Sequence, residues 1–381
     1  MFNFKSKKSI LAMVIVGLFI MSSFSLAMEF KESPKLKKLV ESGELPPVEE
    51  RLPEKPLVID VKEIGTYGGK VFTASLAPKG WGDDTMMMDV SCGFAKPKAD
   101  MSGFELNMAE KIDISEDKKS YTIHLRKGLK WSDGVQFTTD DIKYWYDHVI
   151  QNDDLYPVIP LRFKARGELV NLNIIDKYTA QFQFKAPKPF FINTIGHWDG
   201  LDMMRHPKHY MSQFHPDFVD KEKLTEMAVE AGFAEWYQLY EDKGSGIGQA
   251  SFNPDKPVLG PYKISSINSN RRIWERNPYF WKVDQEGNQL PYLDSIECEI
   301  LSDIEVLNGQ LMSGDLDFGG FYTDIRNYPM LKENEKKLWA VLKFDESEES
   351  EKIWQKVMSK SIKGISIGFR IKKVVRIKED E

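Results

Sequence analysis

The sequence predicts a mixed α/β protein with more than one domain, and three observations support this prediction. Apolar and polar residues alternate over 121–125, which is typical of a strand with one buried face, whereas apolar residues recur at helical spacing over 142–149. The chain has 381 residues, more than a typical single hydrophobic core organises. Aromatic residues make up 12% of it, which suits either a large core or a surface that covers a ligand with flat apolar faces.

The first 27 residues predict an export signal. Lysines in Lys5–Lys8 precede the uncharged apolar run Ile10–Met21, and Ser25–Ala27 offers small residues for cleavage. The run is shorter than the roughly 20 residues of a membrane span. An uncleaved anchor is the alternative, and only the start of the mature chain distinguishes the two. We therefore expect an exported protein, periplasmic or associated with the cell surface.

Charge and cysteine content narrow the function classes. The formal net charge is −6, and removal of the three leader lysines lowers it by three, to −9. An acidic balance of this size argues against nucleic acid as a partner. Two cysteines, Cys92 and Cys298, do not make a disulfide framework. Buried thiols are expected, and one long-range bridge is the alternative.

Residues 28–59 form a charged lead-in that is rich in proline. Its prolines predict a short helix at Pro34–Ser42 followed by extended chain. The glycine-rich segment Gly65–Gly69 then precedes a β-rich stretch, Lys70 to Ala77. A strand is therefore expected at this stretch.

Residues 110–147 predict a strand, a turn and a capped helix in succession. Tyr121, Ile123 and Leu125 share one face of the strand, and Ser132–Gly134 forms a tight turn in which Asp133 is expected to bond the backbone. Thr138 is expected to cap a helix. Arg126 is expected to be paired on a solvated strand face.

Later segments predict two strands around Asp176–Lys177 and an amphipathic helix over Asp220–Glu241. The segment Glu275–Asp294 combines aromatic residues, prolines and a Gly-Asn turn in a way that a generic core does not require.

Several of these segments resemble the extracellular solute-binding proteins of ABC importers, family 5. The chain fills the pattern S-x-D-x-x-x-Y-T, then L-R-x-G-x-x-W-S-D-G and a T-x-x-D helix start. The matching residues are Ser115, Asp117, Tyr121, Thr122, Leu125, Arg126, Gly128, Trp131, Ser132, Asp133, Gly134, Thr138 and Asp141. Gly260–Tyr262, Glu275–Asp294 and Leu311–Asp317 resemble further family segments, so the resemblance covers about residues 60–325.

The resemblance implies a periplasmic-binding-protein-like (type II) α/β lobe with an inserted small domain. The first lobe would comprise 60–82 and 200–330, and the inserted domain about 83–199. Family members continue into a second lobe, so we expect a chain truncated before it, with an atypical charged tail at 331–381. Part of that tail, Ser366–Phe369, faintly resembles a phage prohead protease fragment.

The function implied by the resemblance is the extracytoplasmic substrate-binding component of an ABC importer. Its ligand would be a peptide or an oligosaccharide, its partner an ABC permease in the membrane, and its mechanism hinge closure without covalent chemistry or a cofactor. We expect truncation to weaken ligand binding. The alternatives are a secreted or phage-derived serine protease fragment fused to a binding-protein remnant, and a cell-surface interaction protein.

Three aromatic residues in predicted loops, Trp81, Trp198 and Tyr322, are the candidate ligand-binding residues. Stacked rings bind sugars and peptide planes, although core packing is the competing interpretation for each ring. Four other aromatic residues in the family-like segments are expected to be structural. These are Trp131, Trp145, Tyr279 and Trp281.

Neither a catalytic centre nor a metal site is expected. Gly244–Gly248 lacks the Lys-Ser/Thr ending of a phosphate loop and predicts a flexible loop. His206, His209 and His215 have no acidic or thiol partner at ligand spacing. Ser366 has no recognisable base nearby in the sequence.

Overall fold

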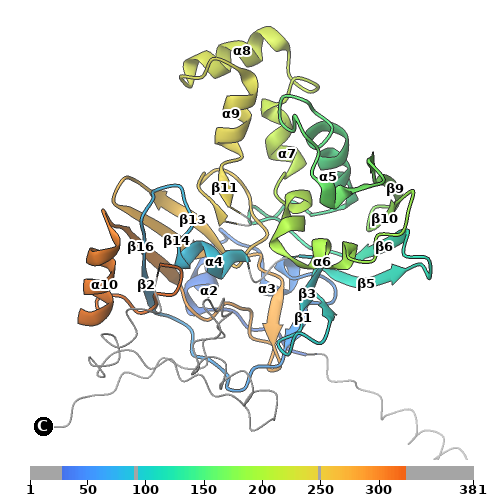
Figure 1. Ribbon diagram of the computed structural model, residues 1–381. Coiled ribbons are helices and arrows are strands. Elements are labelled where there is room, and N and C mark those ends of the chain that lie inside the picture. Colours follow the sequence, from blue (N-terminus) through green and yellow to red (C-terminus); the bar gives the residue numbers. More distant parts are fainter. Residues whose placement is uncertain (1–27, 90–92, 248–249, 323–381) are drawn as a thin grey trace, which may run out of the picture.

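The computed structural model describes residues 28–89, 93–247 and 250–322 (Figure 1). Two four-stranded sheets lie on opposite sides of the molecule, and helices α8 (Lys221–Glu230) and α9 (Trp236–Lys243) project above them. The predicted leader, the tail with Ser366, and Cys92 lie outside the described residues. In the part of the chain that is described, no helix combines the length and apolar character that crossing a membrane requires.

The first sheet has the strand order β13-β14-β16-β2. Strands β13 (Tyr262–Ile267), β14 (Arg271–Arg276) and β16 (Ser295–Ile300) pair antiparallel, whereas β2 (Lys70–Ser75) pairs with β16 in parallel. Strand β2 therefore lies beside a strand more than 200 residues later, and the whole second sheet comes between them in the sequence.

Helices pack on both faces of this first sheet. Helix α4 (Asp83–Asp89) brings Met88 against the buried Trp274 and Ile296. On the opposite face, α10 (Ile304–Ser313) packs Leu307 against Ala74 of β2. The mixed α/β prediction is confirmed in this part of the fold.

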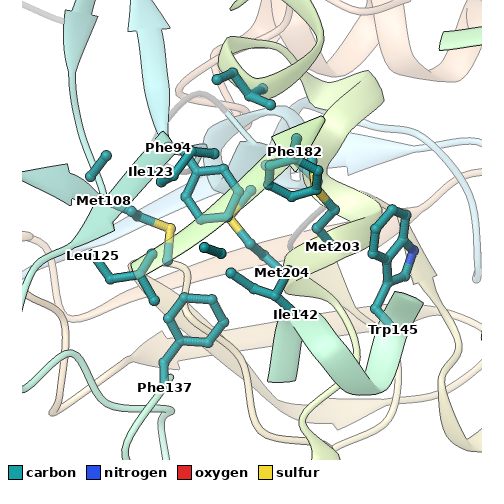
Figure 2. Close-up of a cluster of buried hydrophobic side chains, with 14 of the residues drawn as sticks. Phe94, Met108, Ile123, Leu125, Phe137, Ile142, Trp145, Phe182, Met203 and Met204 are labelled. Carbon is teal, nitrogen blue, oxygen red and sulfur yellow. The ribbon is translucent and has the colours of Figure 1, made fainter. Parts of the chain in front are cut away.

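The second sheet is antiparallel, with the order β5-β6-β10-β9. It comprises β5 (Ala109–Ile114), β6 (Ser120–Leu125), β9 (Asn171–Asp176) and β10 (Thr179–Gln183). The buried face of β6 carries Tyr121, Ile123 and Leu125, as the alternation predicts. Figure 2 shows part of the core behind it. The labelled side chains are Phe94, Met108, Ile123, Leu125, Phe137, Ile142, Trp145, Phe182, Met203 and Met204.

Shorter elements connect and cover the two sheets. Before and between the strands lie α2 (Pro34–Glu41), α3 (Val48–Arg51), β1 (Leu57–Ile59), β3 (Ala95–Pro97), β4 (Phe104–Leu106), β7 (Lys164–Ala165), β8 (Glu168–Leu169), β11 (Gly246–Ile247), β12 (Ala250–Ser251) and β15 (Lys282–Asp284). The helical pieces are α5 (Thr139–Tyr144), η1 (Trp145–Val149), η2 (Leu161–Phe163), α6 (Phe191–Gly196), η3 (Trp198–Met204), α7 (Lys208–Met211) and η4 (Ser212–Phe214).

The buried cluster of the second sheet also includes Met204, Met211 and Tyr240. The segment that carries η3, α7 and α9 thus packs with the core around Trp145. The boundary of the inserted domain near residue 199 remains a prediction.

Two local expectations are wrong. The single helix expected over Asp220–Glu241 is divided into α8 and α9, because Gly232 takes a φ of 85° and the chain leaves the helical path. Arg126 is buried rather than solvated. Its guanidinium donates to the backbone oxygens of Asn107 (2.7 Å) and Lys55 (3.1 Å), so it ties the lead-in to the second sheet.

The capped helix is confirmed. The Thr138 hydroxyl accepts a hydrogen bond from the amide of Asp140, and the Asp141 carboxylate accepts from the amide of Thr138. We expect Thr138→Ala to lower the free energy of unfolding by about 1 kcal/mol in urea denaturation, because the cap is lost. Thr225→Ala, at an exposed position within α8, is the control and should change stability by at most about 0.5 kcal/mol. Equal effects of the two substitutions would contradict a capping role.

Candidate ligand-binding site

The carboxyl end of β2 leads into a tightly held loop, residues 76–82. The Ser75 hydroxyl donates to the backbone oxygen of Trp81 (2.9 Å), and Ser75 forms an isolated bridge with Gly82. A Cβ at Gly82 would stand 2.7 Å from an Asp84 carboxylate oxygen, so the turn into α4 leaves no room for a side chain. The loop therefore closes directly above the end of the sheet.

A buried ion pair fixes this loop to the sheet. The guanidinium of Arg272, on β14, donates to a carboxylate oxygen of Asp84 (2.9 Å) and to the backbone oxygen of Gly80 (2.8 Å). The indole N–H of Trp274 donates to the other oxygen of Asp84 (2.7 Å). All three side chains are fully buried. The position of the loop is thus set by charge-assisted hydrogen bonds that water does not screen.

The segment after α10 lies against the same loop. Asp317 exchanges hydrogen bonds with the backbone of Phe72 on β2, its amide donating (2.9 Å) and its carboxylate accepting (2.9 Å). A carboxylate oxygen of Asp83 then accepts from the amides of Gly320 (2.9 Å) and Phe321 (2.7 Å). Residues 317–322 are therefore positioned by the edge of β2 and the start of α4.

These two segments bring three rings together, here called the aromatic cluster: Trp81, Phe321 and Tyr322. The rings of Trp81 and Phe321 stack with centroids 6.1 Å apart and planes at 14°. Phe321 meets Tyr322 edge to face at 4.9 Å, and the Tyr322 hydroxyl donates to the backbone oxygen of Trp81 (2.6 Å). Phe321 is 42% exposed and the other two are half-buried. The cluster offers flat apolar faces at the surface on a rigid base.

Burial strongly affects the carboxyl group beneath the cluster. It raises the pKa of Asp83 to about 6, the hydrogen bonds from Phe321 and Gly320 lower it, and the charge of Asp84 raises it further. Asp83 therefore changes its charge in the mildly acidic range.

Of the three predicted ligand-binding residues, the structure brings two together. Trp81 and Tyr322 are joined directly, although they are 241 residues apart. Trp198 begins η3, which packs against α5 and α6, and its side chain lies outside the described part of the structure. Phe321 was missed, and the only signal was its position beside Tyr322 after two glycines.

Other residues singled out in the sequence take structural roles. Trp131, Trp145 and Trp281 are fully buried. Asp133 accepts from the amide of Val135 (3.1 Å), which confirms its role in the turn. The Gly244–Gly248 segment, expected to be a loop, contains the short strand β11, paired with β12.

The three histidines considered as metal ligands are placed differently from one another. His209 contacts Asp133 (2.7 Å), His206 contacts the Tyr240 hydroxyl (3.2 Å), and His215 lies close to His148 and Asp217. Of these three histidines, only His215 therefore lies beside two further potential metal ligands. Cys298 is a free, buried thiol.

Comparison with known proteins identifies the class. The model of the bacterial extracellular solute-binding proteins, family 5, matches residues 103–356. The chain is 28% identical over 321 residues to the periplasmic alpha-galactoside-binding protein of Rhizobium meliloti, which covers 77% of the chain and 42% of that protein. It is 29% identical over 212 residues to the glutathione-binding protein GsiB of Salmonella choleraesuis. That alignment covers 55% of this chain and 32% of GsiB.

Solved structures give the same result. An oligopeptide-binding protein OppA superposes with a TM-score of 0.73 at 32% identity, over 84% of this chain and 49% of that chain. The periplasmic binding protein MelB of Agrobacterium fabrum, in complex with stachyose, superposes with a TM-score of 0.64 at 25% identity, over 82% and 46%. The chain spans about half the length of these structures. The periplasmic-binding-protein-like α/β fold expected from the sequence is confirmed.

Proposed function

The chain belongs to the bacterial extracellular solute-binding proteins, family 5, and on this premise we propose that it captures a peptide or an oligosaccharide outside the membrane and delivers it to an ABC permease. Binding is non-covalent. The catalytic alternative depends on Ser366, which lies outside the described residues, and a role as a cell-surface interaction protein stays a prediction.

The observation that carries this proposal is the aromatic cluster. Trp81, Phe321 and Tyr322 come from two segments far apart in the sequence, and buried hydrogen bonds hold both segments against the end of one sheet. Rings that are fixed in place lose little conformational entropy when a ligand stacks on them. The exposed face of Phe321 is the part of the cluster that a ligand meets first.

An oligosaccharide is the first ligand to test. Stacking on a flat ring suits the apolar face of a sugar, and two of the relatives are described as binding an alpha-galactoside or stachyose. Peptides are the second ligand class to test, because OppA, which is described as an oligopeptide-binding protein, superposes with a higher TM-score than MelB.

We also propose that the chain alone binds its ligand weakly. Small-molecule sites commonly bury about 70–90% of the ligand surface, whereas the aromatic cluster forms one wall whose outermost ring is 42% exposed. Closure of a second wall over the ligand, as in hinge-closing receptors, would supply the rest of the contact.

Calorimetric titration tests the ligand class and the affinity together. We expect stachyose to bind with a Kd above about 100 μM, equivalent to less than roughly 5.5 kcal/mol of binding free energy. Di- to pentapeptides are titrated in parallel. A micromolar Kd would contradict weak binding. Failure of both ligand classes at millimolar concentration would contradict the receptor proposal.

Phe321→Ala is expected to weaken binding of the active ligand by about tenfold, because an exposed stacking face is removed. Phe190→Ala is the matched control, since Phe190 is 74% exposed just before α6, away from the cluster. An equal loss in both variants would show that the cluster is not the binding wall.

A further inference from the structure

Two histidines and an aspartate meet where the helix after α5 approaches the segment that leads into α8. One ligand atom from each of His148, His215 and Asp217 lies within 4.8 Å of the others. His148 Nδ1 is 2.6 Å from an Asp217 carboxylate oxygen, and His215 Nδ1 is 3.7 Å from the same oxygen. The group lies on the helical part of the fold, on elements different from those that carry the aromatic cluster.

The backbone carbonyl of His148 orients the ring of His215 toward this group. His215 is fully buried, and its Nε2 donates to the backbone oxygen of His148 (2.9 Å). That bond puts the proton on Nε2 and leaves the lone pair of Nδ1 on the side of Asp217. A ring nitrogen that donates to a backbone carbonyl is the usual support of a metal-binding histidine.

The helix carrying His148 departs from α-helical geometry at this point. Residues Trp145–Val149 form a short π-helix, η1, directly after α5. Although π-helical turns are rare overall, many of those that occur lie at functional sites. Here His148 faces Phe218 at a centroid distance of 4.7 Å, and its ring is also 5.7 Å from that of His215.

Other histidine–aspartate contacts in the described structure lack a second imidazole. His124 contacts Asp113 (2.9 Å), which also pairs with Lys111 (2.7 Å), and His209 contacts Asp133 (2.7 Å). The set around Asp217 is the group of three potential metal-ligating side chains found among the described residues. Two imidazoles and one carboxylate form a donor set that suits zinc and its neighbours in the first transition row.

We propose that His148, His215 and Asp217 bind a divalent transition-metal ion such as Zn²⁺, with water as the remaining ligand. The ion takes the place of the proton between His148 and Asp217 and releases it to solvent. Metal–ligand distances of about 2.0–2.2 Å require the 2.6 Å contact to open. Asp217 has room for this movement because its side chain is 56% exposed.

Metal binding would have to break one existing hydrogen bond. The amide of Asp217 donates to His215 Nδ1 at 3.2 Å, at the lone pair that the metal would use. Asp217 is at the surface, so water can satisfy this amide once the metal binds. The ion would then link η1 to the residues before α8.

Cobalt titration of the full chain, purified without a polyhistidine tag and stripped of metal, tests the proposal. We expect one equivalent of Co²⁺ with the intense visible bands of a four-coordinate site, displaced by micromolar Zn²⁺. His148→Gln and Asp217→Asn should each weaken binding at least tenfold, since each removes a ligand. Both residues are partly exposed, so the variants should keep the far-ultraviolet circular dichroism of the parent protein.

His124→Gln is the matched control, since it removes a histidine of the same exposure class that contacts an aspartate but has no second histidine nearby. Its Co²⁺ binding should equal that of the parent protein. Binding that is unchanged in His148→Gln and Asp217→Asn would overturn the proposal. So would a parent protein that gives no four-coordinate spectrum at stoichiometric Co²⁺.

Discussion

Arg272→Met is expected to lower the free energy of unfolding by about 3–5 kcal/mol, because it leaves a buried carboxylate without its counter-ion. Arg272 and Asp84 are both fully inaccessible to solvent, and among the described residues the side-chain donor left to Asp84 would be the indole of Trp274. Methionine roughly fills the volume but cannot replace the donors to Gly80. Urea denaturation monitored by circular dichroism measures the loss.

A double-mutant cycle separates the charge pair from packing. Adding Asp84→Asn to Arg272→Met removes the second charge, so the double variant should be less destabilised than the sum of the two single variants. Lys70→Met, which removes the partly exposed partner of Glu297, is the control and should change stability by at most about 1 kcal/mol. Strict additivity in the cycle would contradict the account of a coupled buried pair.

Asp83→Asn is expected to stabilise the protein at pH 7 by up to about 3 kcal/mol. The pKa of Asp83 is raised by burial from 3.8 to about 6, and each pKa unit corresponds to about 1.4 kcal/mol. The folded protein therefore binds more protons than the unfolded chain between these values. In the parent protein, the stability that comes from keeping Asp83 protonated is fully present below about pH 4 and is lost as the pH rises through 6.

Asparagine keeps a side-chain oxygen that accepts from the amides of Gly320 and Phe321 without carrying a charge. The stability difference between Asp83→Asn and the parent protein should thus shrink as the pH falls from 7 to 4. Asp60→Asn, at an exposed carboxylate, should leave the pH dependence parallel to that of the parent protein. A difference that stays constant with pH would contradict the raised pKa.

The sequence predicted the segments whose structure is set locally. The alternation at Tyr121–Leu125, the turn at Asp133 and the cap at Thr138 all depend on residues within a few positions, and all three are confirmed. The pairing of Trp81 with Tyr322 was only half predicted. Both residues were candidates, but nothing in the sequence showed that β2 and the segment after α10 lie side by side.

The remaining features depend on contacts that local patterns do not encode. His148 and His215 are 67 residues apart, so ligand spacing along the chain could not reveal their meeting. Arg126 follows a strand whose alternation predicted a solvated side chain, yet the lead-in covers it and uses its donors. The break between α8 and α9 arises from one glycine within a pattern that is otherwise compatible with a continuous helix.

The central claim is that the aromatic cluster at the end of β2 is the wall that receives the ligand. An NMR titration of the chain carrying ¹³C-labelled tryptophan tests it directly and is suited to weak binding. We predict that stachyose or the active peptide shifts the resonance of Trp81, assigned through its loss in Trp81→Phe, and leaves the fully buried Trp145 unchanged. A saturating ligand that leaves Trp81 unmoved while it shifts another tryptophan, such as Trp198, would contradict the claim.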